Sequence, residues 1–236
     1  MSHPLAVRWR AHELPTLRAG ALVTARIELE NAGTTPWRDE RFTVSYHWLD
    51  GRRNPIVWDG LRAPVRADPG DAVAVDVPIR NPIPPGRYVL SIDLVDEGRF
   101  WFGELGSPTL DVDVAVAPRI DDPGDASARL GDAIREPDWD ERVFAAHREG
   151  YAVVGGSVRI PAGVFRRRPP ALTAYAPGTG RVPGFSLPIV CASVVEGVDV
   201  EWVEVEGLPA AVAPPDEPVL YDGRITVRLP SGRRRG

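Results

Sequence analysis

Residues 84–102 carry the pattern that most constrains how this chain can fold. Apolar side chains occupy every second position from Tyr88 to Leu94, and the polar side chains of Ser91 and Asp93 lie between them. A period of two over this length predicts a β-strand with one buried and one exposed face. A Pro-Gly pair at 85–86 predicts the turn that begins this strand.

A second turn is predicted at Asp96, Glu97 and Gly98, after which Arg99–Phe102 can return as a hairpin partner. Further alternating segments begin near Ala21, Phe42, Ile56, Val73 and Leu110. Together they make about seven short strands with turn signals about every 8–12 residues, and no helical period lies between them. The sequence therefore predicts a mainly β chain whose first 117 residues form an antiparallel β-sandwich.

The alternation also predicts which side chains form the core of this sandwich. Trp48 lies in mid-strand on the apolar face, and Tyr88 opens its strand just after a turn, which is the setting of a tyrosine corner. In such a corner the phenol oxygen bonds back to nearby backbone. The predicted core residues are Val23, Ile27, Leu29, Val44, Trp48, Val75, Val77, Tyr88, Leu90, Ile92, Val112 and Val114.

Several segments of the first half, taken together, resemble a known kind of domain. The segments are Leu17–Gly20, Asn31–Trp37, Tyr46–Asp50, Pro85–Leu90 and Trp101–Phe102. They look like Ig-like accessory modules of bacterial surface-glycan machinery, such as those attached to glycosyltransferases and to ATPases of polysaccharide exporters. The resemblance covers about residues 5–117 and implies an Ig-like sandwich. It also implies a role in surface-glycan assembly or recognition, with a glycan or a glycan-assembly protein as partner.

The second half is less regular and predicts a smaller α+β unit. Residues 118–137 read as a linker that contains a short helix over Ala126–Arg135. Residues 138–236 predict a domain that packs on the sandwich, with a helix that begins at Asp138 and a strand over Tyr151–Ile160. A hairpin over Pro218–Leu229, turning at Asp222 and Gly223, completes it.

Charge and composition argue against several classes of partner. The formal net charge is −5 without a basic stripe, so nucleic acid is not an expected partner. Arginine clusters at 166–168 and 233–235 read as solvated surface. No apolar run has the length of a membrane span. Cys191 is the only cysteine, and the N-terminus lacks a hydrophobic signal core, so a cytoplasmic location is expected. No pattern indicates an oligomeric state.

Residue patterns that would indicate catalysis or metal binding are missing from the sequence. None of His3, His12, His47 and His147 has the spacing of a metal site, and no nucleophile motif is complete. We therefore expect no metal, no cofactor and no catalytic site. His47, opposite Trp48 on its strand, is expected on the sheet surface. The alternative is an enzyme of glycan metabolism with a site between the two halves, using Tyr151, His147, Arg181 or Tyr221.

The first half holds more tryptophan than a core of this size needs. Alternation places Trp101 on the face opposite Phe100 and Phe102, and Trp58 lies at a turn. Exposed indole rings with nearby charged groups suit sugars, whose C–H faces stack on the ring while their hydroxyls bond to polar groups. The sequence thus predicts a glycan-binding patch of Trp58, Asp59, Arg99 and Trp101 in a non-enzymatic protein. Two alternatives remain open: these rings pack under the second half, or they offer a protein-interaction adaptor its docking face.

Overall fold

The computed structural model describes residues 4–162, 164, 169–178 and 180–231. The chain divides into two compact units, Met1–Ala117 and Pro118–Gly236, which we describe separately. The arginine clusters at 166–168 and 233–235 lie outside the described residues. Strands dominate both units, so the chain is mainly β, as the alternation predicts.

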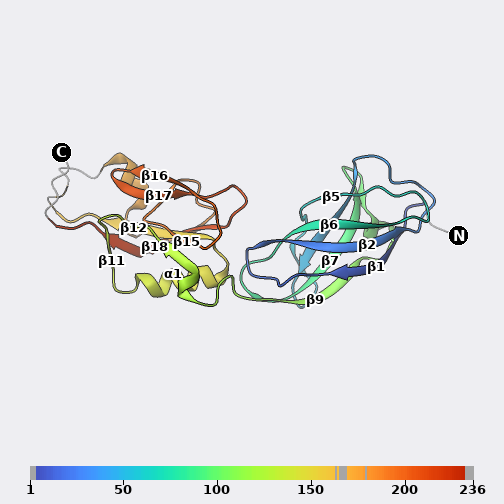
Figure 1. Ribbon diagram of the computed structural model, residues 1–236, viewed down its shortest axis with the longest axis horizontal. Helices are drawn as coiled ribbons and strands as arrows, with labels where there is room; N and C mark the ends of the chain where they lie inside the picture. Colours follow the sequence, from blue (N-terminus) through green and yellow to red (C-terminus); the bar gives the residue numbers. More distant parts are fainter. Residues whose placement is uncertain (1–3, 163, 165–168, 179, 232–236) are drawn as a thin grey trace. The chain divides into compact units, whose positions relative to one another are not determined.

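The unit Met1–Ala117 is built from two antiparallel sheets (Figure 1). The first sheet has the order β1-β2-β6, with β1 at Val7–Glu13, β2 at Leu22–Asn31 and β6 at Ala72–Arg80. The second has the order β4-β3-β7-β8, formed by Pro55–Val57, Phe42–Leu49, Gly86–Asp96 and Phe100–Trp101. Two further strands join it, β5 (Ala63–Pro64) on β3 and β9 (Leu110–Val116) on β7. The predicted hairpin is confirmed, because Val95 pairs with Trp101.

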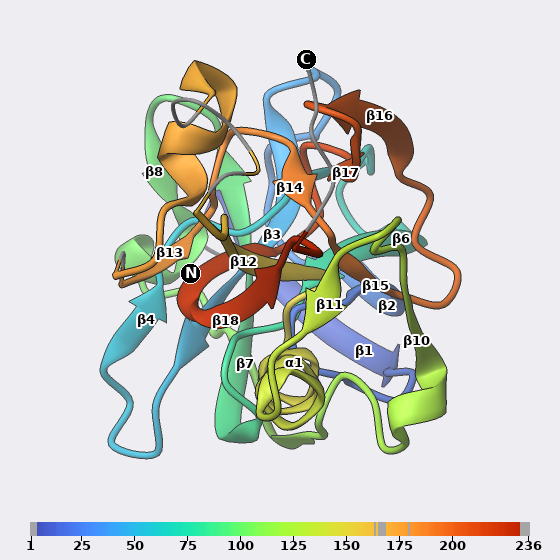
Figure 2. The ribbon, with the colours of Figure 1, turned by 90° about the vertical axis from the view of Figure 1, so that its left-hand side faces the viewer.

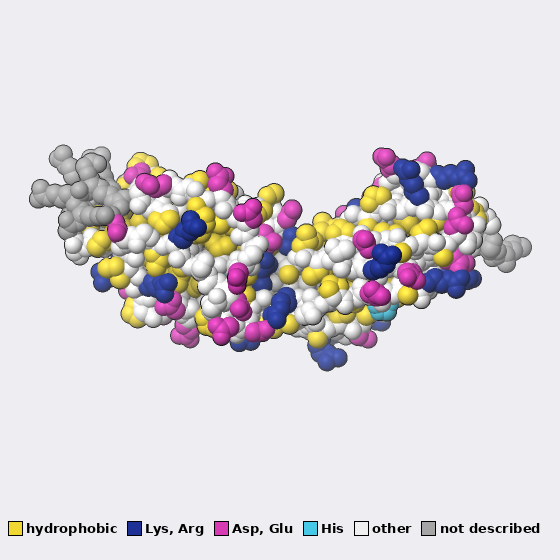
Figure 3. Space-filling model, viewed as in Figure 1, with side chains coloured by type: hydrophobic (Ala, Val, Ile, Leu, Met, Phe, Trp, Pro, Cys, Tyr) yellow, Lys and Arg dark blue, Asp and Glu magenta, His cyan; other side chains and the backbone are white. Residues whose placement is uncertain are grey.

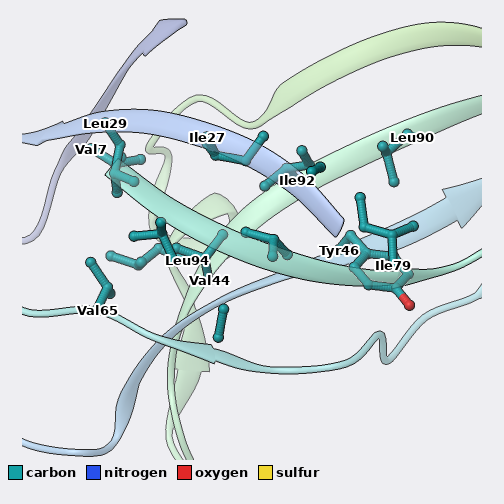
Figure 4. Close-up of a cluster of buried hydrophobic side chains, with 14 of the residues drawn as sticks. Val7, Ile27, Leu29, Val44, Tyr46, Val65, Ile79, Leu90, Ile92 and Leu94 are labelled. Atoms are coloured by element: carbon teal, nitrogen blue, oxygen red, sulfur yellow. The ribbon is translucent and has the colours of Figure 1, made fainter. Parts of the chain in front are cut away.

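Apolar side chains from both sheets meet in one core (Figure 4). The side chains of Trp48, Leu90 and Ile92 are all fully buried, as their alternation on β3 and β7 predicts. Most of the predicted core residues are buried, whereas four of them are only partly so. These four are Val23, Tyr88, Val112 and Val114.

Polar ends of core aromatics tie the two sheets together. The indole Nε1 of Trp48 donates to the Arg80 carbonyl at 2.8 Å, and the Tyr46 hydroxyl accepts from the Arg80 amide at 2.8 Å. Both aromatics lie on β3, whereas Arg80 ends β6 in the other sheet. The Tyr88 hydroxyl donates to the Pro84 carbonyl at 2.6 Å, which confirms the bond expected of a tyrosine corner.

The unit Pro118–Gly236 has a central six-stranded sheet with helix α1 (Trp139–Glu149) against β12 and β18 (Figures 1 and 2). The sheet order is β10-β15-β12-β18-β11, with β13 also on β18. These strands span Ala126–Ala128, Ser193–Val195, Val153–Arg159, Val219–Arg228, Ile134–Arg135 and Arg181–Pro183. A second sheet, β14-β17-β16, spans Ile189–Val190, Leu208–Val212 and Glu201–Val205. Short 3-10 helices lie at Pro123–Asp125 (η2) and Pro170–Tyr175 (η3) in this unit. A further one lies at Phe102–Leu105 (η1) in the first unit.

Two predictions for this second unit are wrong. The expected helix over Ala126–Arg135 is replaced by β10 and β11, which are edge strands of the central sheet, so residues 118–137 are no separate linker. The expected hairpin over Pro218–Leu229 is one strand, β18, that runs parallel to β12. Asp222 and Gly223, which the sequence predicts as a turn, lie instead at a β-bulge. The register shifts there, because Gly156 pairs with Asp222 while Ser157 pairs with Thr226.

Helix α1 begins just after Asp138, as predicted, and Gly150 follows its last residue. Asp138 makes no capping bond; its carboxylate accepts from Arg142 Nε at 2.6 Å. On the face shown in Figure 3, acidic and basic side chains are interspersed over both units.

Two tryptophans of the first unit, one in β3 and one in the loop after β4, test which side chains form the core. Trp48→Ala removes a fully buried ring, so the free energy of unfolding should fall by about 3–5 kcal/mol. Trp58→Ala removes a ring that is 51% exposed, so the loss should stay below about 1 kcal/mol. Urea unfolding of the full chain, followed by circular dichroism, measures both. Similar losses for the two variants would contradict the assignment.

Candidate functional site

The sheet of β3 and β7 buries both of its faces. One face carries Trp48 and Leu90 into the core. The other carries polar side chains that the alternation predicts to be exposed, yet they are almost completely buried. These are Ser45, His47, Ser91 and Asp93, with exposed fractions of 0%, 4%, 4% and 1%. The prediction that this face lies open to solvent is therefore wrong, and what covers it defines the candidate site.

Three aromatic rings form the centre of this cover. The ring of His47 stacks on Trp58, with centroids 4.1 Å apart and planes 19° apart. It also lies against Trp101, at 4.3 Å and 55°. The two indoles are 6.4 Å apart and meet edge to face. The structure thus brings together the two tryptophans that the sequence predicts as stacking platforms, and it adds a histidine between them.

Backbone contacts fix the proton position on His47. Its Nδ1 bonds to the Trp58 carbonyl oxygen, which only accepts, so Nδ1 carries the proton and Nε2 keeps its lone pair. Burial lowers the pKa of His47. The imidazole is therefore neutral at pH 7.

Arg62 holds the segment that carries Trp58 onto the sheet. Its Nη1 donates to Ser45 Oγ at 2.7 Å and to the Gly60 carbonyl at 2.6 Å. The guanidinium also pairs with Asp59 and Glu97 and lies 5.0 Å from the centre of the Trp101 ring. One side chain thus links the loop after β4, the sheet and one indole.

A cavity of about 390 Å³ opens beside these rings. His47, Trp58 and Trp101 supply its aromatic wall. The rest of its wall combines apolar residues, Leu49 and Pro55, with polar and charged ones. The charged residues of the wall are Arg53, Asp93, Glu104 and Asp111.

Asp93 is the most deeply buried of these charged groups. Its Oδ1 accepts the Leu94 amide at 2.7 Å, and its Oδ2 accepts the Gly103 amide at 3.0 Å. Burial raises the pKa of Asp93 most, the negative charges of Glu104 and Asp111 also raise it, and the two amide bonds lower it; the resulting pKa is about 6. Within the described part of the chain, no cationic side chain lies in ion-pair distance of it.

Asp111 has the opposite environment on the neighbouring strand. It accepts from Ser91 Oγ at 2.7 Å and from Thr109 Oγ1 at 2.8 Å, and it pairs with Arg53. Although burial acts to raise the pKa of Asp111, these hydrogen bonds lower it overall. One cavity therefore holds two carboxyl groups whose pKa values are shifted in opposite directions.

Asp59 and Arg99, the other two predicted patch residues, lie outside the cavity wall. Asp59 lies on the exposed side of the loop, paired with Arg62. The Arg99 guanidinium lies 5.6 Å from the centre of the Phe100 ring and 3.3 Å from Asp96. Phe100 packs against the core rather than the aromatic wall. Arg99 lies in the turn before β8, so the alternation that sets the faces of Phe100 and Trp101 does not extend to it.

Sequence reasoning missed His47, Asp93, Glu104 and Asp111. A signal was present, because polar residues recur at alternate positions on three strands that pair in register. His47 lies opposite Ser91, and Ser91 lies opposite Asp111. Pairing these three strands in advance would have grouped the polar residues. The loops that bury them had no such signal.

The second unit holds a separate histidine–serine pair. His147 Nδ1 bonds to the Tyr151 carbonyl at 2.8 Å, so its Nε2 accepts from Ser193 Oγ at 2.9 Å. Both residues border a cavity of about 320 Å³, but burial lowers the pKa of His147 to about 4. An imidazole with so low a pKa is a weak base near pH 7. The carboxylate partner that would mark a catalytic histidine is replaced here by a backbone carbonyl.

Tyr151 contacts His147 through its backbone carbonyl, whereas Arg181 and Tyr221 make their contacts elsewhere. Arg181 pairs with Glu149 and Asp222, and its guanidinium lies 5.7 Å from the Tyr151 ring. Tyr221 is fully buried and stacks on Phe185. Among the described residues, no group of acids, histidines and cysteine is placed to hold a metal ion. No helix in that same part of the chain is long and apolar enough to cross a membrane.

Asp93 should titrate far above an ordinary aspartate. Because the folded-state pKa of about 6 exceeds the ordinary value of 3.8, the folded state binds its proton more tightly than the unfolded state. The stability from this group is present below about pH 4 and is lost as pH rises through about 6, a change of about 2–3 kcal/mol. Carbon-13 NMR of the carboxyl groups measures the pKa directly. Asp93→Asn should remove this part of the pH dependence, whereas the exposed Asp113→Asn should retain it. A pKa below about 4.5 would contradict the burial.

His147 should give the opposite response in the second unit. Its folded-state pKa of about 4 lies below the ordinary value of 6.5, so the unfolded state binds the proton more tightly. The stability from this group is present above about pH 6.5 and falls on acidification, by about 2 kcal/mol between pH 7.5 and pH 5. Urea unfolding at both pH values, compared with His147→Gln, measures the difference. Equal pH dependence in the two proteins would refute the assignment.

Comparisons with known proteins do not identify a family or a function for this chain. No protein-family model and no curated protein match the chain. Among solved structures, it is similar to a family 123 glycoside hydrolase from Clostridium perfringens, described for glycolipid glycan hydrolysis. The two are 13% identical with a TM-score of 0.27, and the match covers 43% of this chain and 22% of the hydrolase. A likeness this weak establishes neither the fold nor the function.

Proposed function

We propose that this protein is a non-enzymatic carbohydrate-binding or accessory module in bacterial surface-glycan assembly. The observation that carries the proposal is the convergence of Trp58 and Trp101 at one cavity of about 390 Å³. Trp58 is 51% exposed although it stacks on His47, so part of its indole surface faces solvent. An exposed indole at the edge of a polar cavity suits a sugar ring, which is apolar on its C–H faces and polar around its rim.

The polar wall of the cavity supplies partners for sugar hydroxyls. Carboxylate oxygens of Asp93, Glu104 and Asp111 accept hydrogen bonds, and Arg53 donates them. Hydrogen bonds to ionised groups are about twice as strong as neutral ones. The cavity is open, however, so a bound sugar remains partly hydrated and the affinity is modest. We expect millimolar to high-micromolar dissociation constants, or about −4 to −6 kcal/mol.

Two matched tryptophan variants test this proposal. Trp101→Ala, and separately Trp58→Ala, should weaken binding of surface-polysaccharide fragments about tenfold or more, because each removes a stacking surface. Trp202→Ala is the control, since Trp202 is a partly exposed tryptophan of the second unit under the Arg129 guanidinium. NMR shifts during titration measure binding. If Trp101→Ala folds normally and binds the same fragments unchanged, the cavity is not the glycan site.

Protein docking is a second candidate function, and exposed apolar side chains favour it. Ile56, Val57, Trp58 and Leu61 are 51%, 39%, 51% and 42% exposed along one short segment. Such a cluster also suits a protein partner. Ile56→Ser separates the two functions, because it alters this apolar segment without touching a residue of the cavity wall. It should leave glycan binding intact and weaken only protein docking.

An enzyme of glycan metabolism is a third candidate. Asp93 and Asp111 share the cavity with pKa values shifted in opposite directions, a pattern also found in pairs of catalytic carboxyl groups. Incubation with the same fragments, followed by an assay for new reducing ends, separates hydrolysis from binding.

A further inference from the structure

We propose that the cavity beside Trp58 and Trp101 selects a glycan unit that carries a protonated primary amine. The inference rests on the proposed function and names the class of sugar that the same site prefers. It follows from the charge balance of the wall, from the environment of one carboxyl group and from the aromatic rings beside it.

The wall has more negative than positive charge. Three carboxyl groups, those of Asp93, Glu104 and Asp111, face one guanidinium, that of Arg53. Arg53 is already paired with Asp111. His47, on the strand next to Asp93, is neutral at pH 7 because its pKa is lowered by burial. Asp93 and Glu104 therefore have no counter-charge in the wall, and a cationic ligand would supply one.

Two backbone amides hold the carboxylate of Asp93 in the wall of the cavity. The amides of Leu94 and Gly103 bind its two oxygens, at 2.7 Å and 3.0 Å. A carboxylate has about four lone-pair positions, so these two donors leave acceptor capacity unused. Gly103 approaches so closely that a Cβ at this position would lie 2.8 Å from Asp93 Oδ2. The lack of a side chain at Gly103 thus permits the contact that orients the carboxylate.

The aromatic wall favours a cation as well. Indole rings attract cations at their faces, and the attraction is larger where water is partly excluded. The Arg62 guanidinium lies 5.0 Å from the centre of the Trp101 ring, and its charge is balanced by Asp59 and Glu97. An ammonium group beside the rings would meet the carboxylate of Asp93 and the indole surface together. A uronic acid would instead bring a further negative charge to an acidic wall.

The test compares cationic, neutral and acidic oligosaccharides. The probes are glucosamine oligomers, fully deacetylated or fully N-acetylated and of equal length, with galacturonic acid oligomers as the acidic case. Binding to the full chain is measured by NMR titration near pH 7 at low salt. The deacetylated oligomer should bind about tenfold more tightly than the acetylated one, and the acidic oligomer should bind most weakly.

A matched pair of variants tests the role of the carboxylate. Asp93→Asn should bring the affinities of the deacetylated and acetylated oligomers close together, whereas Asp113→Asn should keep their difference. Asp113 is exposed on the same strand as Asp111 but does not line the cavity, so it controls for the change in net charge. If Asp93→Asn does not fold, Glu104→Gln and the pH dependence of binding by the wild-type protein test the same role. Glu104→Gln should then reduce the difference between the two oligomers. Near pH 5, where Asp93 is mostly protonated, the preference for the amine should shrink.

The outcomes separate this inference from the proposed function. Equal binding of the deacetylated and acetylated oligomers by the wild-type protein overturns the amine preference and leaves glycan binding standing. An unchanged preference in Asp93→Asn, or in Glu104→Gln together with a flat pH profile, also overturns it. If no oligosaccharide binds, including surface-polysaccharide fragments, the proposed function itself fails.

Discussion

The first unit depends on the need to bury both faces of β3 and β7. Their apolar face meets the other sheet, so hydrophobic burial stabilises the sandwich in the ordinary way. Their second face carries polar side chains, and burying those is favourable only when each finds a hydrogen-bond partner. Ser45 receives the Arg62 guanidinium, and Asp93 receives two backbone amides. The cover therefore combines polar contacts from Arg62 and the backbone amides with the rings of Trp58 and Trp101 that pack on His47.

This division explains which parts of the first unit could be predicted from sequence. The alternation of apolar and polar residues in β7 predicts the strand and its core face, and the turn residues after it predict the hairpin to β8. All three predictions use residues that are close in sequence. The same alternation placed Trp101 correctly on the face away from Phe102. What covers the polar face depends on loop contacts, such as Arg62 with Ser45, between residues that are distant in sequence or lie in irregular segments. No periodic pattern reports such contacts, so His47 and Asp93 were expected at the surface.

In the second unit, fewer elements could be predicted from local sequence, because several of its strands depend on pairing with distant residues. Helix α1 was predictable because its apolar spacing and flanking residues are local signals. The edge strands β10 and β11 are three and two residues long, and only their partners in the sheet hold them extended. The bulge opposite Gly156 is also a product of pairing. A Cβ on Gly156 would lie 2.1 Å from the Ile225 carbonyl oxygen, so the bulged strand passes directly over this residue.

Two glycines anchor the walls of the aromatic cavity to the sheet. Gly103 abuts Asp93, and Gly60 abuts Tyr46, where an added Cβ would lie 2.6 Å from the backbone oxygen. At both points an added side chain would clash with its neighbour, so these contacts constrain the backbone near Trp58 and Glu104. The backbone contacts of the two glycines are thus separate from the side chains that line the cavity. Substitution of Trp58 or Glu104 changes the surface of the cavity and leaves the close backbone contacts at Gly60 and Gly103 in place.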